Sequence, residues 1–350
     1  MKSKIGLIAA LLACLAAGSV RAEDTLRVGF CAKTITSAAA PFAIANQFGW
    51  FGKSDFKVEL VPLSGSVDCV KYVGTGELRY SLPSVEPLGV LRPQGIRAKI
   101  FYTAYQGNIY GIDVPAASPI KTLQDLKGKK IGVASMGSGG ALVARAIAAN
   151  LGASDSIAII AIGEGAQAAA LLHGNQVDAL SLYDTQYALI ENAGVALRQI
   201  ANPDFDRFPS NGFIVLDDVL AKHRDEAVAL GRGYAMGTVF AMANPEAAAR
   251  INWQVFPYTK ATGKDEATAL NDDVKTLEAR IANWKLDKAG VKNWGESSLV
   301  NYQAYLDFLL KWEVLKEPIK ASDVVTNDLI GDINAFDPAP IVAQAKAWKP

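Results

Sequence analysis

The stretch SPIKTLQDLKGKKIGVASMGSGG, residues 118–140, decides the fold. Residues 121–126 predict a short amphipathic helix that ends before Gly128, and residues 130–134 predict a buried strand. The small-residue loop 135–140 follows and leads into a helix-forming run at residues 141–151. A strand that ends at a helix N-terminus leaves free backbone amides there, which favours an anion or a polar group. We therefore expect a ligand-contacting loop within an α/β fold.

Strands and helices alternate through most of the chain, which indicates an α/β class of protein. The first predicted strands are residues 26–30, 57–61, 79–82 and 96–105, with helices at 41–48 and 67–73. The second series has strands at 131–134, 157–162 and 179–182 and helices at 141–151 and 165–172. Residues 212–216 predict a return strand, followed by helices at 218–242 and 247–256.

The length favours two lobes, because the roughly 328 residues after position 22 exceed what one hydrophobic core usually serves. We expect residues 23–110 and 212–350 to form the first lobe and residues 111–211 the second. The final third reads as mostly helical, and a buried stripe is expected on one of its helices. The stripe residues recur at helical spacing: Tyr302, Tyr305, Leu306, Leu309 and Trp312.

Two motifs carry a resemblance to a known family. Residues 121–133 read KTLQDLKGKKIGV, of the form KxLxDLKGKKIGV, and residues 174–179 read GNQVDA, of the form GxxVDA. With these motifs the chain resembles the periplasmic substrate-binding proteins of ABC importers. The branch is the nitrate/sulfonate/taurine (NitT/TauT-like) type, which also includes binders of pyrimidine precursors.

The resemblance implies a type II periplasmic binding protein, with two α/β lobes, two hinge crossovers and a helical C-terminal region. It implies that a small-molecule solute binds in the interlobe cleft, and that ABC permease subunits of the inner membrane are the partners. The small solute would be an organic anion, a sulfonate or carboxylate. ATP would be hydrolysed in another subunit, and we expect this chain to act as a monomer without a cofactor.

The N-terminus predicts export. Lys2 and Lys4 precede an apolar core at residues 5–17, and residues 20–22 (VRA) form a small-x-small cleavage site. The first 22 residues, 1–22, are therefore interpreted as a cleaved secretory signal peptide that delivers the protein to the periplasm. Cys14 also permits a lipoprotein interpretation, but it lies inside the apolar core rather than after it.

The charge of the exported chain excludes nucleic acid as a partner. Removal of Lys2, Lys4 and Arg21 leaves 32 basic residues (35 − 3) against 35 acidic ones, a net charge near −3. Nucleic-acid binding requires a basic surface instead.

Two cysteines remain after cleavage, Cys31 and Cys69. An even pair in an oxidising compartment is typical of a disulfide, and two free buried thiols are the alternative.

Candidate ligand-binding residues lie just beyond the predicted strands, because ligands of open α/β sheets bind at the carboxyl ends of strands. These candidates are Lys33, Ser64, Ser66, Asp68, Ser84, Glu86, Tyr105, Asn108, Ser135, Gly137, Ser138, Gly139, Tyr183, Asp184 and Asn211.

Two classes of solute stay open at this point. Ser138, its neighbouring amides and Lys33 would suit a sulfonate or carboxylate. Glu86 and Asp184 would instead suit an aminated heterocycle such as a pyrimidine precursor, because two carboxylates repel a bare anion.

No catalytic arrangement stands out. The Gly-Ser-Gly at residues 137–139 lacks the spacing of a hydrolase nucleophile motif, and neither His173 nor His223 has an evident place beside it. Both histidines also lack partners at metal-ligand spacing. We therefore expect a binding protein without a metal. The alternatives are an enzyme on the same fold, such as a pyrimidine-forming synthase, and a ligand-sensing partner of a membrane receptor.

Overall fold

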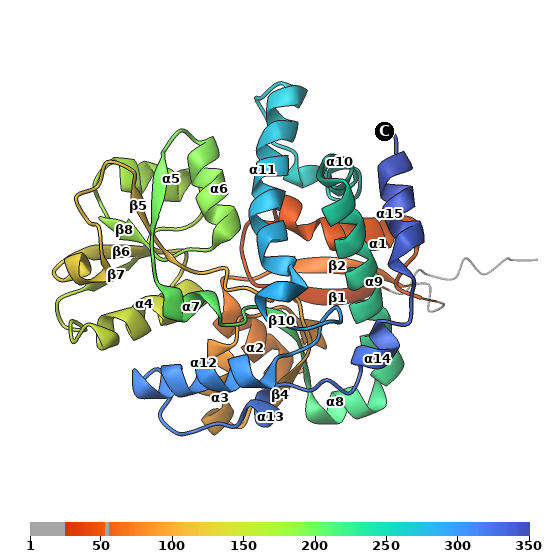
Figure 1. Ribbon diagram of the computed structural model, residues 1–350, viewed down its shortest axis with the longest axis horizontal. Coiled ribbons are helices and arrows are strands. Elements are labelled where there is room, and N and C mark those ends of the chain that lie inside the picture. Colours follow the sequence, from red (N-terminus) through yellow and green to blue (C-terminus); the bar gives the residue numbers. More distant parts are fainter. Residues whose placement is uncertain (1–24, 53–55) are drawn as a thin grey trace, which may run out of the picture.

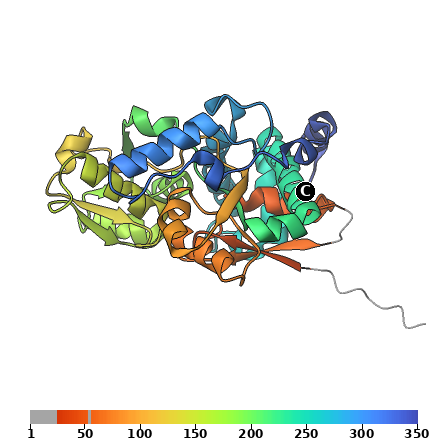
Figure 2. The same cartoon turned by 90° about the horizontal axis from the view of Figure 1, so that it is seen from below.

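The computed structural model describes residues 25–52 and 56–350, which form two α/β lobes (Figure 1). Each lobe is built on one five-stranded sheet, and the two lobes lie side by side when the molecule is turned (Figure 2). The predicted signal peptide lies outside the described residues. This architecture is the two-lobed α/β fold that the sequence predicts.

The first sheet has the strand order β2-β1-β3-β10-β4. Its strands are β1 (Thr25–Phe30), β2 (Lys57–Pro62), β3 (Tyr80–Ser81), β4 (Ala98–Thr103) and β10 (Gly212–Leu216). Strand β1 pairs in parallel with β2 and β3, whereas β10 runs antiparallel to β3 and β4. The return strand β10 therefore lies between β3 and β4 in the first sheet.

The second sheet has the order β7-β6-β8-β5-β9. Its strands are β5 (Ile112–Pro115), β6 (Lys130–Val133), β7 (Ala158–Ala161), β8 (Ala179–Leu180) and β9 (Leu197–Ile200). The helices of this lobe are α4 (Gly139–Asn150), α5 (Gly165–His173) and α6 (Asp184–Asn192), with the short 3₁₀ helix η3 (Leu123–Leu126) before β6. The quoted stretch thus forms a 3₁₀ turn, a strand and the start of α4, close to the expected order.

Two connections join the lobes. One runs from β4 to β5, and the other runs from β9 through α7 (Pro203–Asp206) to β10. The expected lobe boundaries, at 110/111 and 211/212, fall inside these two connections. The division of the chain into domains stays a prediction.

Helices cover the first sheet and make up the final third of the chain. The earlier ones are η1 (Ser37–Ala39), α1 (Ala40–Phe48), α2 (Ser66–Gly74), α3 (Glu86–Leu91), η2 (Arg92–Gln94), α8 (Asp217–Lys222), α9 (Arg224–Ala243) and α10 (Pro245–Val255). The later ones are η4 (Pro257–Thr259), α11 (Glu266–Trp284), η5 (Leu286–Lys288), α12 (Leu299–Lys311), α13 (Ala321–Val324), α14 (Ile330–Ile333) and α15 (Pro338–Ala347).

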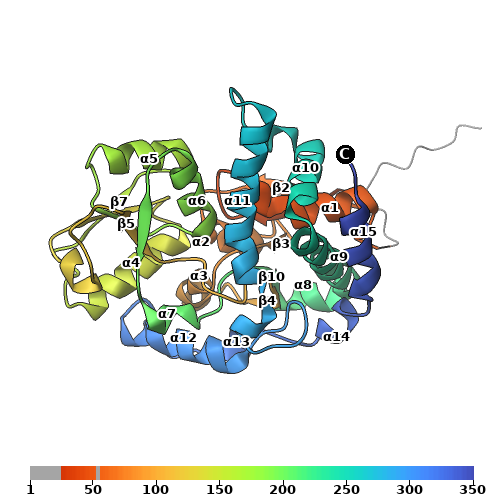
Figure 3. The same cartoon turned by 45° about the horizontal axis from the view of Figure 1, so that its top comes forward.

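Helix α11 stands between the lobes (Figure 3). It packs against α10 and η1 on the side of the first lobe and against α6 of the second. One face of α11 is therefore buried against both lobes. The side chains on this face contact the first lobe and the second lobe at once.

The stripe on α12 is buried as its spacing predicts. Tyr302, Tyr305, Leu306 and Leu309 are buried, while Trp312 at the end of the helix is half-buried. Burial of four large side chains of this kind contributes about 1.5–3 kcal/mol each, so α12 is a structural part of the first lobe.

Cys31 and Cys69 are joined by a disulfide with an S–S distance of 1.96 Å and a Cα–Cα distance of 5.8 Å. Cys31 directly follows β1, and Cys69 lies within α2. The bond therefore ties the end of a central strand to the helix beside it.

No helix of residues 25–52 and 56–350 is long and apolar enough to span a membrane. The same residues contain no cluster of three or more His, Cys, Asp or Glu side chains placed to hold a metal ion.

Candidate ligand-binding pocket

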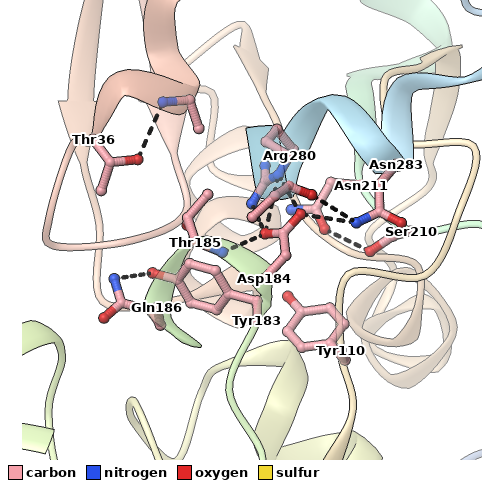
Figure 4. Close-up of polar contacts among 12 residues, drawn as sticks. Thr36, Tyr110, Tyr183, Asp184, Thr185, Gln186, Ser210, Asn211, Arg280 and Asn283 are labelled. Carbon is pink, nitrogen blue, oxygen red and sulfur yellow. Dashed lines mark hydrogen bonds and ion pairs between the residues drawn. The ribbon is translucent and has the colours of Figure 1, made fainter. Parts of the chain in front are cut away.

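A pocket lies where the carboxyl end of β1, the two interlobe connections, the start of α6 and helix α11 meet (Figure 4). Its lining is Phe30, Cys31, Ala32, Thr34, Thr36, Ala38, Leu82, Tyr105, Ile109, Tyr110, Tyr183, Thr185, Asn211 and Arg280. About 30 Å³ inside this lining admits the centre of a water molecule. The pocket is thus small and is formed by both lobes together.

Arg280 is the only charged residue among the described residues that line the pocket. It lies on the buried face of α11, and its guanidinium stacks on the ring of Tyr105, 4.0 Å from the ring centroid. Asp184, the first residue of α6, accepts from its Nε at 2.8 Å and from its Nη2 at 2.6 Å (Figure 4). Asn283 adds a third donor to the same carboxylate at 3.0 Å.

This ion pair is nearly dry, since the side chains of Arg280 and Asp184 are 4% and 9% exposed. Burial alone would lower the pKa of Arg280, but the charge and hydrogen bonds of Asp184 outweigh it, and the pKa lies above its usual range. Asp184 engages the Nε–Nη2 edge, so Nη1 stands outside the fork. The pocket wall therefore contains a permanent cation, Arg280, whose charge is balanced by the carboxylate of Asp184.

Tyrosines form much of the remaining wall. Tyr110 and Tyr183 meet edge to face, with ring centroids 6.3 Å apart. The Tyr183 hydroxyl donates to Glu164 at 3.2 Å and accepts from Gln186 at 3.2 Å. Burial raises the pKa of Tyr105, Tyr110 and Tyr183, so all three stay neutral hydroxyls. The walls are aromatic with polar tips, which suits a small organic molecule.

The two serine loops meet across the lobe boundary instead of lining the pocket. The Ser135 hydroxyl donates to the Ser64 carbonyl at 2.5 Å, and the Val67 amide donates to the Gly137 carbonyl at 3.0 Å. The Ser138 hydroxyl caps α4, because it accepts from the Ala141 amide at 3.2 Å. Hydrogen bonds between these loops therefore join the two lobes on one side of their boundary.

Gly65→Ala is expected to keep the lobes apart on this side. Gly65 has φ +154°, and a Cβ there would lie 2.7 Å from the Gly137 carbonyl oxygen. We expect a larger radius of gyration in small-angle X-ray scattering and solute affinity about tenfold weaker. Gly137→Ala is the matched control, because its Cβ would make only an ordinary contact with Val67 at 3.5 Å. Wild-type scattering and affinity in Gly65→Ala would show that this contact does not limit closure.

A second polar cluster lies behind Tyr110 and does not reach the pocket. Glu86 is 1% exposed, and its Oε1 accepts a short hydrogen bond from the Tyr305 hydroxyl. Burial raises the pKa of Glu86. Ser84 donates its amide to the Ser66 hydroxyl at 3.1 Å. The Ser84 hydroxyl lies against Gly139 of the second lobe, so this cluster sits at the lobe boundary.

The family model described as "NMT1/THI5 like" matches residues 36–248, well over half of the chain. The chain belongs to the NMT1/THI5-like family. No curated protein sequence matches it.

Solved structures share the fold of this NMT1/THI5-like protein. The alkanesulfonate-binding protein of Xanthomonas axonopodis pv. citri, bound to MOPS, is 18% identical with a TM-score of 0.64, covering 86% of this chain and 98% of that one. The aliphatic sulphonate-binding protein of Escherichia coli is 14% identical with a TM-score of 0.64, covering 89% and 100%. The nitrate-binding protein of Synechocystis PCC 6803 is 16% identical with a TM-score of 0.61, covering 93% and 98%. These likenesses show the periplasmic binding protein fold.

Three of the residues expected from strand ends line the pocket of the NMT1/THI5-like protein: Tyr105, Tyr183 and Asn211. Asp184 lies directly behind it through Arg280. Asn108 holds the first interlobe connection, because its side chain accepts from the Tyr110 amide at 3.0 Å. The others lie elsewhere: Lys33, Ser64, Ser66, Asp68, Ser84, Glu86, Ser135, Gly137, Ser138 and Gly139. Their ligand-binding role stays a prediction.

Sequence reasoning missed Arg280, Thr34, Thr36, Tyr110 and Thr185 as pocket residues. The sequence does contain a signal for Arg280. The residues on the buried face of α11 follow one another at helical spacing, and Arg280 is one of them. That face comprises Ala269, Thr276, Leu277, Arg280, Asn283 and Trp284. An arginine on the apolar face of an amphipathic helix needs a buried partner, which marks it for attention.

Proposed function

We propose that this protein is the solute-binding component of an ABC uptake system and captures a small organic anion, a sulfonate or carboxylate, in the interlobe pocket. It delivers the solute to a membrane permease and carries out no chemical reaction. The observation that carries this proposal is the small pocket formed by residues of both lobes, with one cation on its wall.

The position of the pocket supports capture by lobe closure. Thr36 comes from the first lobe, Tyr183 and Thr185 from the second, and Asn211 from a connection between them. A solute that contacts both lobes favours the arrangement in which they meet, because the open arrangement offers it fewer contacts. The 30 Å³ left for water centres indicates that the lobes separate to admit it.

The hydrogen-bonding groups of the pocket favour an anion over an amine. Glu86 and Asp184 were the two groups that would have suited an amino group. Glu86 lies outside the pocket lining, and Asp184 is already committed to Arg280 and Asn283. Arg280 is the donor that an acid would approach, because Asp184 takes only its Nε and Nη2 and leaves Nη1 outside the ion pair. Asn211 lines the same wall, with its amide donating to the Leu82 carbonyl.

The names of the fold neighbours support an anionic solute, since two are named as sulfonate-binding proteins and one as a nitrate-binding protein. We further propose that the protein acts in the periplasm as a monomer, after removal of residues 1–22. The lobe limits at 23–110, 111–211 and 212–350 belong to the same proposal.

A thermal-shift screen of the chain from Glu23 tests the solute class. Alkanesulfonates, aliphatic and aromatic carboxylates, nitrate and aminopyrimidines are compared at equal concentration. A solute that binds only the folded protein adds about 2.7 kcal/mol of stability at a hundredfold excess over its dissociation constant. We expect hits among the acids. Hits confined to the aminopyrimidines would overturn the anion assignment and leave the solute-binding role in place.

A further inference from the structure

A second hollow lies on another side of the lobe boundary, between α6 of the second lobe and α11. It is an open groove of about 520 Å³. Carboxylates dominate its lining: Asp113, Asp184, Glu191 and Glu278 face one ammonium group, that of Lys275. Apart from Asp184, which faces Arg280, none of these residues belongs to the site described above.

Asp113 lies at the buried base of this groove. It sits on β5, opposite Gln199 of β9, and is 7% exposed. Its Oδ1 has no hydrogen-bond partner among the described residues. Burial, followed by the charge of Glu191, raises the pKa of Asp113 to about 7. Asp113 therefore contributes to the groove lining a carboxyl group with one buried oxygen acceptor that has no donor.

The charge around Asp113 calls for a cation. Asp184 is neutralised by Arg280, which leaves Asp113, Glu191 and Glu278 against Lys275. Tyr187 of α6 also lines the groove, but its hydroxyl donates to the Gly111 carbonyl at 2.9 Å and burial raises its pKa, so it adds no charge. The described residues offer no three-carboxylate cluster for a metal ion. A ligand that carries its own hydrogen-bond donors fits better.

We propose that this groove binds a small organic cation whose primary ammonium group donates to Asp113, with Glu191 and Glu278 along its sides. Because α6 belongs to the second lobe and α11 packs on the first, the bound cation contacts both sides of the boundary. It therefore favours the closed arrangement and adds to the affinity for the solute in the interlobe pocket.

Putrescine, a diammonium alkane, is the probe. The chain from Glu23 is melted with putrescine and with KCl or MgCl₂ at matched ionic strength, and binding is measured by calorimetry. Putrescine is expected to raise the melting temperature of the wild type beyond the effect of either salt. Asp113→Asn is expected to weaken putrescine binding about tenfold, the value of one charge-assisted hydrogen bond. Asp155→Asn, which removes an exposed charge of the same lobe, is the matched control and keeps wild-type binding.

Three outcomes would overturn the proposal: no shift with putrescine, an equal shift with the matched salts, or undiminished binding in Asp113→Asn. Glu191→Gln provides a second test should Asp113→Asn fail to fold, and it is expected to weaken binding in the same direction. Titration of organic acids separates this result from the solute assignment, because the interlobe pocket can bind an acid whether or not putrescine binds.

The pH dependence gives an independent readout. Asp113 with a pKa near 7 is largely protonated at about pH 5 and ionised at about pH 8, whereas putrescine keeps its charge throughout. Affinity is expected to rise about tenfold or more over this range in the wild type and to change less in Asp113→Asn. Equal pH profiles in the two proteins would contradict the assignment of Asp113.

Discussion

Arg280→Ala is expected to destabilise the folded protein by about 3–5 kcal/mol, because it leaves Asp184 buried without its cation. Asp184 would keep the Asn283 amide as a partner, which does not balance its charge. The substitution also removes the guanidinium that stacks on Tyr105. Urea unfolding followed by circular dichroism measures the loss as a lower midpoint.

The double variant Arg280→Met, Asp184→Leu separates stability from binding. Replacing both members of a buried ion pair by apolar side chains of similar volume is often neutral or stabilising. We expect the double variant to regain most of the wild-type midpoint but not the affinity for an organic acid. If an acid binds the double variant as tightly as the wild type, Arg280 is not part of the binding site.

Loss of the Cys31–Cys69 disulfide is expected to lower the stability by about 4 kcal/mol. The bond closes a loop with a sequence separation of 38, and the chain-entropy relation gives about 4 kcal/mol for that length. The variant Cys31→Ala, Cys69→Ala avoids placing a hydroxyl in the buried position of Cys69. Its unfolding midpoint is compared with that of the oxidised wild type.

Reduction provides the control for this prediction. Dithiothreitol should lower the wild-type midpoint toward that of the double alanine variant and leave the variant unchanged. Solute binding should also weaken, because Cys31 lines the interlobe pocket and the bond holds it against α2. An unchanged wild-type midpoint under reducing conditions would contradict a stabilising role.

The alternation of strands and helices could be predicted from the sequence because it depends on local patterns. Residues 130–134 predict a strand, and β6 covers Lys130–Val133. The spacing of Tyr302, Tyr305, Leu306 and Leu309 likewise predicts the buried face of α12. Each of these features follows from the spacing of apolar residues along the chain, and packing against neighbouring elements does not alter it.

The pocket was harder to predict, because its residues come from segments that only the tertiary fold brings together. Arg280 lies 96 positions from Asp184 in the chain. Nothing local to residues 135–140 indicates that Ser135 would reach the Ser64 carbonyl across the lobe boundary. The free amides at the start of α4 predicted a ligand site, and in the structure this loop contacts the opposite loop.

The directions of the Glu86 and Asp184 side chains could not be predicted from the sequence either. From their positions at strand ends, Glu86 and Asp184 could both have faced a solute. Glu86 is instead buried against Tyr305, and Asp184 is paired with Arg280. Sequence position predicts the edge of the sheet at which each residue lies, but the direction of each side chain depends on helices α11 and α12 from the end of the chain.

A crystal structure of the protein with an acid selected by the thermal-shift screen tests the central claim most directly. The account predicts density for the acid inside the interlobe pocket, with its charged group within hydrogen-bond distance of Arg280 Nη1 and its body against Tyr105 and Tyr183. An acid bound outside this pocket, or within it but away from Arg280, would contradict the account.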